Sequence, residues 1–266
     1  MTDTFNRSPT LQIVLLVSGS FVFSYCFGVF MHEVGHVLAY LYYGIPTSVF
    51  VVHPFGRSYM KPGVDIENGL LLIGVSGSLF NIACAMSCSF VFRHSRNLML
   101  LPLLMWRATS LLQEAVAMNL DMISGGRFDW AKVVATGIPM SLVVWLSIIF
   151  LVVGCISFLR LLALAGVTRG DSLYRILVIC SGAIVPFFLV SFAYAWMFDQ
   201  TLIYSKLVAL ASSVALSAMV AVLFKPAFPY LEEPPDYRSG NVEWKHAAFA
   251  TGLALSVVIA ELRLFG

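Results

Sequence analysis

Residues 11–43 read LQIVLLVSGSFVFSYCFGVFMHEVGHVLAYLYY, and this stretch decides the fold class of the chain. Its one residue with a formal charge is Glu33, which lies between two histidines near the end of the run. A bilayer core about 30 Å thick requires about 20 apolar residues of helix, so the run is long enough to span a membrane. We expect a retained membrane helix here, because the apolar core of a cleaved signal peptide is much shorter.

The whole chain has the composition of a membrane protein. Of its 266 residues, 59% are hydrophobic and 11% are charged, and its mean hydropathy is +0.88. A chain with so few polar residues cannot cover its surface with polar groups, which excludes a soluble protein. The formal net charge of +2 provides no strong basic field, so no nucleic-acid partner is expected.

Long apolar runs along the chain predict about seven membrane spans. Because lipid offers no hydrogen bonds to the backbone, each span must be helical. The runs cover residues 11–43, 69–92, 97–118, 131–159, 174–198, 202–224 and 246–264. We therefore predict an all-α, polytopic transmembrane helical bundle that forms a single integral membrane domain. The cell membrane is the expected location, and the distribution of Lys and Arg residues among the loops leaves the orientation open.

One stretch between the spans has the pattern of strands. Residues 45–68 read IPTSVFVVHPFGRSYMKPGVDIEN, where β-branched and aromatic residues are followed by Gly and Pro. This pattern predicts a short β-like stretch or hairpin at the membrane surface after the first span.

The pattern with chemical content is HEVGH at residues 32–36. On a helix, positions i and i+4 lie on one face, so His32 and His36 can bind one metal ion. Glu33 is positioned to act as a general base on a metal-bound water, as in zinc hydrolases. Burying three such polar groups at membrane depth is energetically costly unless something coordinates or solvates them. We therefore predict a Zn²⁺ site rather than a buried polar cluster without metal.

A zinc hydrolase site needs a third protein ligand, which is usually a carboxylate. The connection around residues 119–130 returns to the membrane level of the histidines, and Asp129 at the expected start of the fourth helix is the first candidate. Its alternative role is as an N-cap, where an acidic side chain also favours the helix dipole. Asp121 is the second candidate, with a solvated interfacial carboxylate as its alternative. Farther along the third span, Arg107 and Glu114 share a face, and we expect them to form a buried ion pair.

These residues resemble a known family, the site-2 proteases, which are intramembrane zinc metalloproteases of the M50 class. HEVGH at the end of the first span carries the resemblance, and Gly77-Ser78-Leu79-Phe80-Asn81 is similar to the family's Gly-Pro-x-x-Asn motif with Ser in place of Pro. The third motif, Asn-Pro-x-x-x-Leu-Asp-Gly, is not kept: Leu120 follows Asn119, and an alignment on residues 125–127 puts Ser124 where the family has Asp. The resemblance covers a core of about residues 11–150, whereas the additional helices, about 151–266, match no motif.

The resemblance implies a metalloendopeptidase that uses zinc to cleave the transmembrane segment of another membrane protein. Such an enzyme must unwind a helical substrate, and the stretch around Phe50–His53 would offer a pairing edge for it. Asn81 and Asn119 would then bind the extended substrate backbone, with helix–helix packing as the alternative for both residues.

Two other classes of function compete with the protease. An inactive relative, or a membrane protein that only holds or senses zinc, is favoured by the missing third motif. A transporter would need more charged residues in the later spans than Lys206, Glu261 and Arg263. Since no polar stretch is long enough for an appended sensing domain, any regulation is expected to come from the later spans or from a membrane partner.

Overall fold

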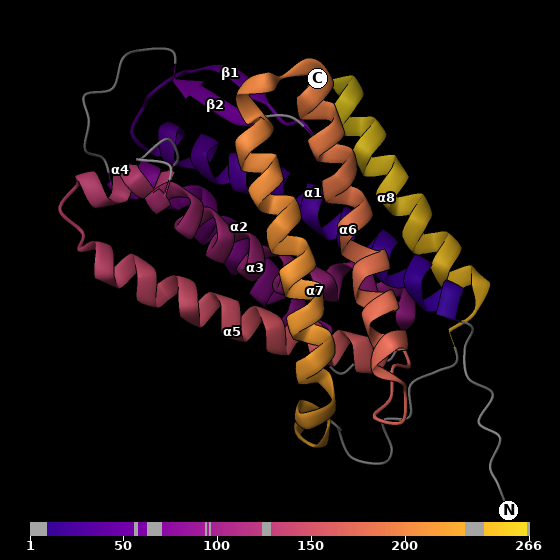
Figure 1. The fold of residues 1–266 in the computed structure, drawn as a ribbon. Coiled ribbons are helices and arrows are strands. Elements are labelled where there is room, and N and C mark those ends of the chain that lie inside the picture. The colour runs from indigo at the N-terminus through magenta and orange to yellow at the C-terminus, as the bar shows by residue number, and fades with distance from the viewer. Residues whose placement is uncertain are drawn as a thin grey trace, which may run out of the picture.

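The computed structural model describes residues 10–55, 58–62, 71–93, 95, 97–123, 129–231 and 242–264, and these residues are mainly helical. Within these described ranges, six helices are long and apolar enough to cross a membrane. They are α1 (Thr10–Tyr42), α2 (Leu71–Val91), α5 (Met140–Leu164), α6 (Leu173–Phe198), α7 (Ile203–Leu231) and α8 (Trp244–Leu264). Figure 1 shows them as one bundle, which confirms the predicted all-α polytopic fold.

The remaining predicted span, residues 97–118, corresponds to α3 (Leu101–Ile123), a helix of 23 residues. It carries three charged residues, Arg107, Glu114 and Asp121. It packs against α1, α2 and α5, and most of its described side chains are buried. Because protein surrounds much of α3, the helix can hold polar groups that a lipid-facing helix cannot.

The prediction of one continuous helix over residues 131–159 is wrong. The segment forms a short helix, α4 (Asp129–Ala135), and then α5 after a break (Figure 1). Gly137 in the break has a positive φ of 98°, a conformation that side chains with a Cβ rarely adopt. Pro139 follows as the residue before the first turn of α5, where its missing N–H costs no helical hydrogen bond. The break frees α4 to pack against α2 and α3 in its own direction.

A two-stranded antiparallel sheet follows α1, which confirms the predicted hairpin. β1 (Thr47–Val51) pairs with β2 (Tyr59–Pro62), with Phe50 opposite Met60. The chain leaves α1 through Gly44, whose φ is +67°, and the Ile45 N–H donates to the Tyr40 carbonyl at 2.9 Å. The Phe50 ring then packs edge-on against Phe30, which holds the hairpin against α1 near the histidines.

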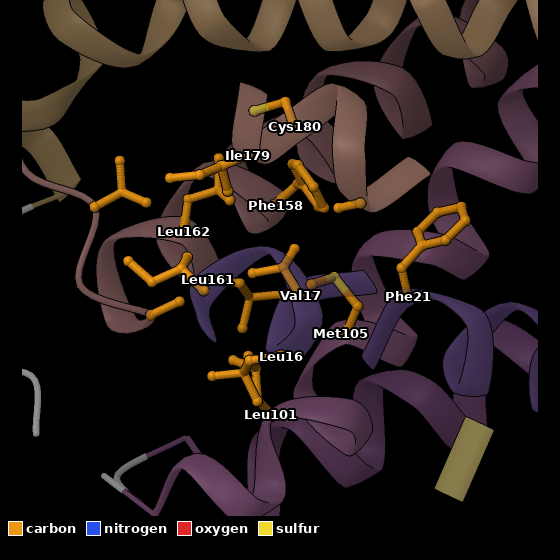
Figure 2. Close-up of a cluster of buried hydrophobic side chains, with 14 of the residues drawn as sticks. Leu16, Val17, Phe21, Leu101, Met105, Phe158, Leu161, Leu162, Ile179 and Cys180 are labelled. Atoms are coloured by element: carbon orange, nitrogen blue, oxygen red, sulfur yellow. The ribbon is translucent and has the colours of Figure 1, made fainter. Parts of the chain in front are cut away.

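The main hydrophobic core lies where α1, α3, α5 and α6 meet (Figure 2). Side chains in it include Leu16, Val17 and Phe21 of α1, Leu101 and Met105 of α3, Phe158 and Leu162 of α5, and Ile179 and Cys180 of α6. On another side of α1, α8 makes an especially close approach. A Cβ on Gly19 would lie 2.6 Å from the backbone carbon of Ala250, so only glycine permits this helix crossing.

We predict that Gly19→Ala destabilises the bundle by about 1–3 kcal/mol, because the new methyl group forces α1 and α8 apart. Gly252→Ala on α8 is the matched control, since no atom lies within 4 Å of its added Cβ. The control should be neutral or stabilising, as alanine is the better helix former by about 1 kcal/mol. Thermal unfolding of both variants in detergent measures the difference, and equal melting temperatures would contradict the α1–α8 packing.

Candidate metal centre

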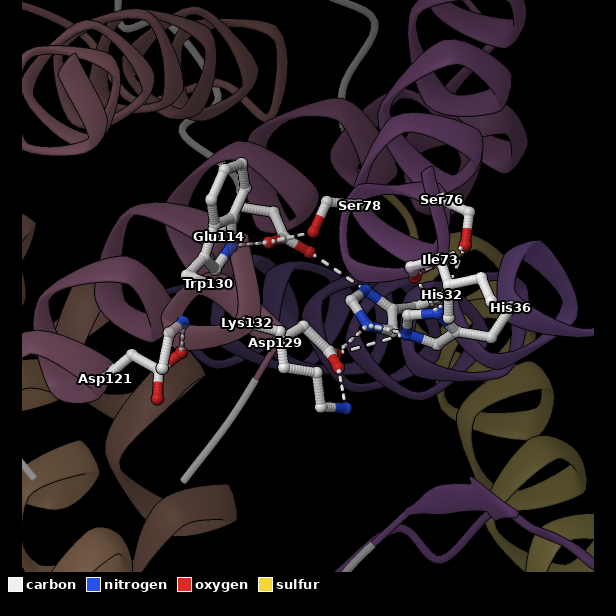
Figure 3. A network of polar contacts seen from close by, with 11 residues as sticks. His32, His36, Ile73, Ser76, Ser78, Glu114, Asp121, Asp129, Trp130 and Lys132 are labelled. Atoms are coloured by element: carbon white, nitrogen blue, oxygen red, sulfur yellow. Dashed lines mark hydrogen bonds and ion pairs between the residues drawn. The ribbon is translucent and has the colours of Figure 1, made fainter. Parts of the chain in front are cut away.

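Three side chains from two helices converge on one point (Figure 3). His32 and His36 come from α1, and Asp129 is the first residue of α4. The Nε2 atoms of the two histidines are 3.1 Å apart, and Oδ2 of Asp129 lies 3.3 Å from the first and 3.1 Å from the second. The structure thus brings together the two predicted histidines and the first of the two aspartate candidates.

The spacing of these atoms matches a zinc site. In tetrahedral coordination, bonds of 2.0–2.1 Å put neighbouring ligand atoms about 3.3–3.4 Å apart. The three observed separations of 3.1–3.3 Å lie close to that value. Two imidazole nitrogens and one carboxylate oxygen are also a donor set used by catalytic zinc sites, which keep a further position for water. The residues present therefore fit Zn²⁺.

The site depends on a close crossing of α1 and α2, which two glycines allow. A Cβ on Gly35 would lie 2.5 Å from the Ser76 carbonyl oxygen. A Cβ on Gly77 would lie 2.6 Å from the Nε2 atoms of both His32 and His36. Gly35 is the last variable position of HEVGH, and Gly77 is the first residue of the second motif, so both motifs provide the space that the ligands occupy.

Each candidate ligand has a second partner that fixes its orientation. Nδ1 of His36 lies 2.9 Å from the Ile73 carbonyl oxygen, which can only accept a hydrogen bond. Nδ1 of His32 lies 3.1 Å from Oε1 of Glu114. When Nδ1 carries the proton of a neutral imidazole, Nε2 presents a lone pair. In this tautomer both rings direct a lone pair at the point where the three side chains meet, which is the arrangement that a bound cation requires.

The two carboxylate oxygens of Asp129 make different contacts, one with the histidines and one with a lysine of its own helix. Its Oδ2 faces the two rings, while its Oδ1 accepts a hydrogen bond from Nζ of Lys132 at 3.0 Å. Burial by itself would raise the pKa of the Asp129 carboxyl, but contacts with His32 and His36 hold this pKa well below its ordinary value. The side chain is therefore ionised at neutral pH, as a metal ligand must be.

Glu114 contributes a second carboxylate to this region, and the expected ion pair with Arg107 is wrong. Instead, the Glu114 side chain contacts His32 and accepts hydrogen bonds from Ser78 Oγ at 2.6 Å and Trp130 Nε1 at 3.2 Å. Nε of Arg107 is buried and has no hydrogen-bond partner among the described residues. Sequence spacing places both residues on one face of α3. In the structure, however, polar groups of three neighbouring helices provide the hydrogen-bond partners of Glu114, and Arg107 does not.

Asp121, the alternative third ligand, is placed in a different role. Its Oδ2 accepts a hydrogen bond at 2.7 Å from the backbone N–H of Ala131, in the first turn of α4. The side chain is buried and satisfies one of the helix N–H groups that lack an intrahelical partner. Asp121 therefore positions the helix that carries Asp129.

Glu33, the predicted base, is buried on α1 beside the cluster. Its carboxyl group lies close enough to His32, His36 and Asp129 to interact electrostatically with all three. The site is more accessible from the α4 side: the Asp129 side chain is 26% exposed and that of Lys132 is 66% exposed. A water molecule can therefore approach the cluster past α4.

The two asparagines predicted to bind substrate make contacts within the bundle. Asn81 is fully buried, and its Oδ1 accepts hydrogen bonds from Trp106 Nε1 at 2.8 Å and Ser110 Oγ at 3.1 Å. Asn119 donates to the Ala115 carbonyl at 2.7 Å and to Ser147 Oγ at 3.1 Å. These contacts join α2 to α3 and α3 to α5, and the substrate-binding role of both residues stays a prediction. The alternative alignment on Ser124 falls outside the described residues.

Sequence reasoning missed the groups that orient the candidate ligands: Ile73, Ser76, whose Oγ lies 3.2 Å from His36 Nδ1, Ser78, Trp130 and Lys132, and also the role of Glu114. One signal was present: an acidic residue inside a predicted span, which is costly without a specific partner. No protein-family model, curated protein or solved structure matches this chain.

We predict that Gly77→Ala weakens zinc binding about tenfold or more while the bundle still folds, because the new methyl group occupies the space in front of both Nε2 atoms. Gly28→Ala on α1 is the control, since its Cβ would make only ordinary contacts of 3.5 Å or longer. Competition with a zinc chelator measures the affinity. Equal affinities for wild type and Gly77→Ala would contradict the geometry of the site.

We also predict that the two aspartates differ in their effect on metal content. Asp129→Ala should lose the zinc, because it removes a ligand atom. Asp121→Asn should keep one zinc per chain, since its amide oxygen can still accept the hydrogen bond from Ala131. Metal analysis of the purified variants gives the ratio, and loss of zinc from Asp121→Asn alone would reverse the assignment.

Proposed function

We propose that this chain is a zinc-dependent intramembrane endopeptidase that hydrolyses peptide bonds in or near transmembrane segments of other membrane proteins. The observation that carries the proposal is the convergence of His32, His36 and Asp129, whose facing ligand atoms lie 3.1–3.3 Å apart. The resemblance of HEVGH and of residues 77–81 to the site-2 proteases points to the same chemistry.

The depth of the site supports a membrane substrate. His36 lies six residues before the end of α1 at Tyr42, which corresponds to about 9 Å of helix. The cluster is thus near one end of a membrane-spanning helix, on the side of the bundle where the hairpin and α4 lie (Figure 1). α4 has seven residues and is too short to span, so its polar side chains provide a route for water from that side.

The residues of the chain divide the catalytic work among them. Bound zinc would supply Lewis acidity to the attacking water and to the scissile carbonyl. Glu33 would take a proton from the attacking water and pass it to the leaving amine, as general base and then general acid. Glu114 and the Ile73 carbonyl would keep the two imidazole rings in orientation, and Lys132 would keep Asp129 in position.

An extended substrate backbone also needs a partner for its amide groups, because unwinding a helix leaves them without hydrogen bonds. β1 pairs with β2, and the Phe50 ring of β1 contacts Phe30 of α1, two residues before His32. Its position makes the hairpin the segment best placed to bind an unwound substrate by strand addition.

A second candidate function is a protein that holds or senses zinc without proteolysis. It is favoured by Asn81, which is fully buried and whose side-chain oxygen is already hydrogen-bonded to Trp106 and Ser110. The two candidates differ in one respect: only the endopeptidase requires Glu33 to transfer protons.

We predict that Glu33→Gln keeps one zinc per chain and lowers the rate of cleavage by about 10²–10⁴-fold, because it removes a base and no ligand. The measurement is the rate at which the purified chain cleaves tagged single-span membrane proteins when both are reconstituted in the same liposomes. The single-span proteins are inserted in both orientations. Glu261→Gln on α8, a buried glutamate outside the metal centre, is the matched control. Cleavage by Glu33→Gln at the wild-type rate would refute the role of Glu33, and zinc binding without cleavage by the wild type would favour the second candidate.

A further inference from the structure

We propose that Glu114 is a positioning residue that holds His32 as a metal ligand and locks α4, with Asp129, onto the site. The inference rests on the proposed metal centre and adds a residue that neither HEVGH nor the second motif specifies. The Glu114 carboxylate lies on α3, is 2% exposed and touches groups from three other helices.

The contacts of Glu114 form a closed set of one acceptor and three donors (Figure 3). Oε1 lies 3.1 Å from His32 Nδ1, and Oε2 accepts from Ser78 Oγ and from Trp130 Nε1. Indole N–H can only donate, and an ionised carboxylate can only accept. The indole and the serine hydroxyl both bind Oε2, which leaves Oε1 to accept the proton of His32 Nδ1. With Nδ1–H committed to Glu114, the lone pair of a neutral His32 lies on Nε2, the atom that faces the candidate metal position.

The contacts of Glu114 link Asp129 to His32 through α4. Asp129 and Trp130 are neighbours at the start of that helix, so one short segment supplies both a ligand atom and a donor to Glu114. Ser78 adds a donor from α2. It is next to Gly77, whose missing side chain leaves space for the two histidines. Glu114 is therefore the point at which α1, α2 and α4 are joined to α3 around the site.

The charges near the site also favour this role over simple burial of an acid. Burying an isolated carboxylate in a membrane bundle is unfavourable, so an apolar residue would fill the position at lower free energy if the charge had no role. With a divalent ion bound, the negative charges of Asp129 and Glu114 together balance its two positive charges. Glu114 thus contributes the charge that a neutral histidine pair and one aspartate lack.

The decisive variant is Glu114→Gln, because it keeps the size of the side chain and changes one oxygen to an NH₂ donor. Its single oxygen cannot serve both His32 Nδ1 and Trp130 Nε1. If the NH₂ group faces His32, it imposes the tautomer in which Nε2 is protonated, and if it faces Trp130, two donors oppose each other. We expect zinc and cobalt affinity to fall about 10–100-fold, as measured by chelator competition.

Glu261→Gln is the matched control, because it makes the same chemical change at a glutamate that is 3% exposed on α8. Its metal affinity should equal that of the wild type. The visible absorption spectrum of the Co²⁺-loaded protein reports the ligand geometry and should change in Glu114→Gln alone. In the zinc-saturated protein, ¹⁵N spectra of labelled histidine should show a shift of an Nδ1–H signal in Glu114→Gln that Glu261→Gln does not show.

Trp130→Phe and Ser78→Ala provide a second test if Glu114→Gln does not fold. Each removes one donor to Oε2 and no metal ligand, so each should weaken metal binding relative to the Glu261→Gln control. If Glu114→Gln folds, unchanged affinity together with an unchanged Co²⁺ spectrum would overturn the inference and leave the metal centre intact. The same result in both Trp130→Phe and Ser78→Ala would also overturn it. Absence of zinc from the wild type would refute the metal centre itself, which distinguishes the two failures.

Discussion

The close crossing of α1 and α2 at Gly35 and Gly77 is the constraint on which the rest of the site depends. At this crossing a methyl group on either glycine would meet backbone or imidazole atoms at 2.5–2.6 Å. The same approach places His36 beside the Ile73 carbonyl and brings Ser78 within reach of Glu114. Without it, the two histidines would still share a helix face, but the His36 ring would lose the Ile73 carbonyl that orients it. Small residues at a helix crossing thus do here what they do in many membrane bundles, and they add space for two ligands.

The concentration of charged groups in this region follows from the membrane setting. In a bundle surrounded by lipid, an ionisable side chain persists where partners compensate it. The described structure places Glu33, Glu114, Asp129 and Lys132 around the two histidines, and three of these four side chains have a hydrogen-bonding or ionic partner within 3.3 Å. α3 can carry its share because it is enclosed by α1, α2 and α5 rather than by lipid. The same enclosure is what makes Glu114 sensitive to substitution, since water cannot replace a lost partner there.

α1 joins two parts of the molecule that differ in sequence character. One side of this helix meets α2 and α3 and forms the candidate metal centre, while other sides meet α6 and α8. The close approach of Gly19 to Ala250 and the aromatic contacts of Phe21 with Phe187 and Phe188 fix α1 in the later half of the bundle. The position of the ligands along α1 is therefore supported by helices that carry no recognisable motif, and the two halves are expected to fold and function together.

By itself, the sequence determined the membrane class, the helical fold and the hairpin after α1, and it named His32 and His36 with two aspartate candidates, Asp129 and Asp121, for a metal site. Apolar runs of about 20 residues and the i, i+4 histidine pair are local patterns, whereas the choice between the two aspartates depends on tertiary packing. Only the tertiary structure decided that α4 and α5 are separate helices, that Asp121 caps α4, and that Glu114 turns to His32 rather than to Arg107. The physical reason is that a buried carboxylate takes the partners that packing brings to it from other helices. Helical spacing specifies the face on which Glu114 lies, whereas the groups facing it come from α1, α2 and α4, far away in sequence.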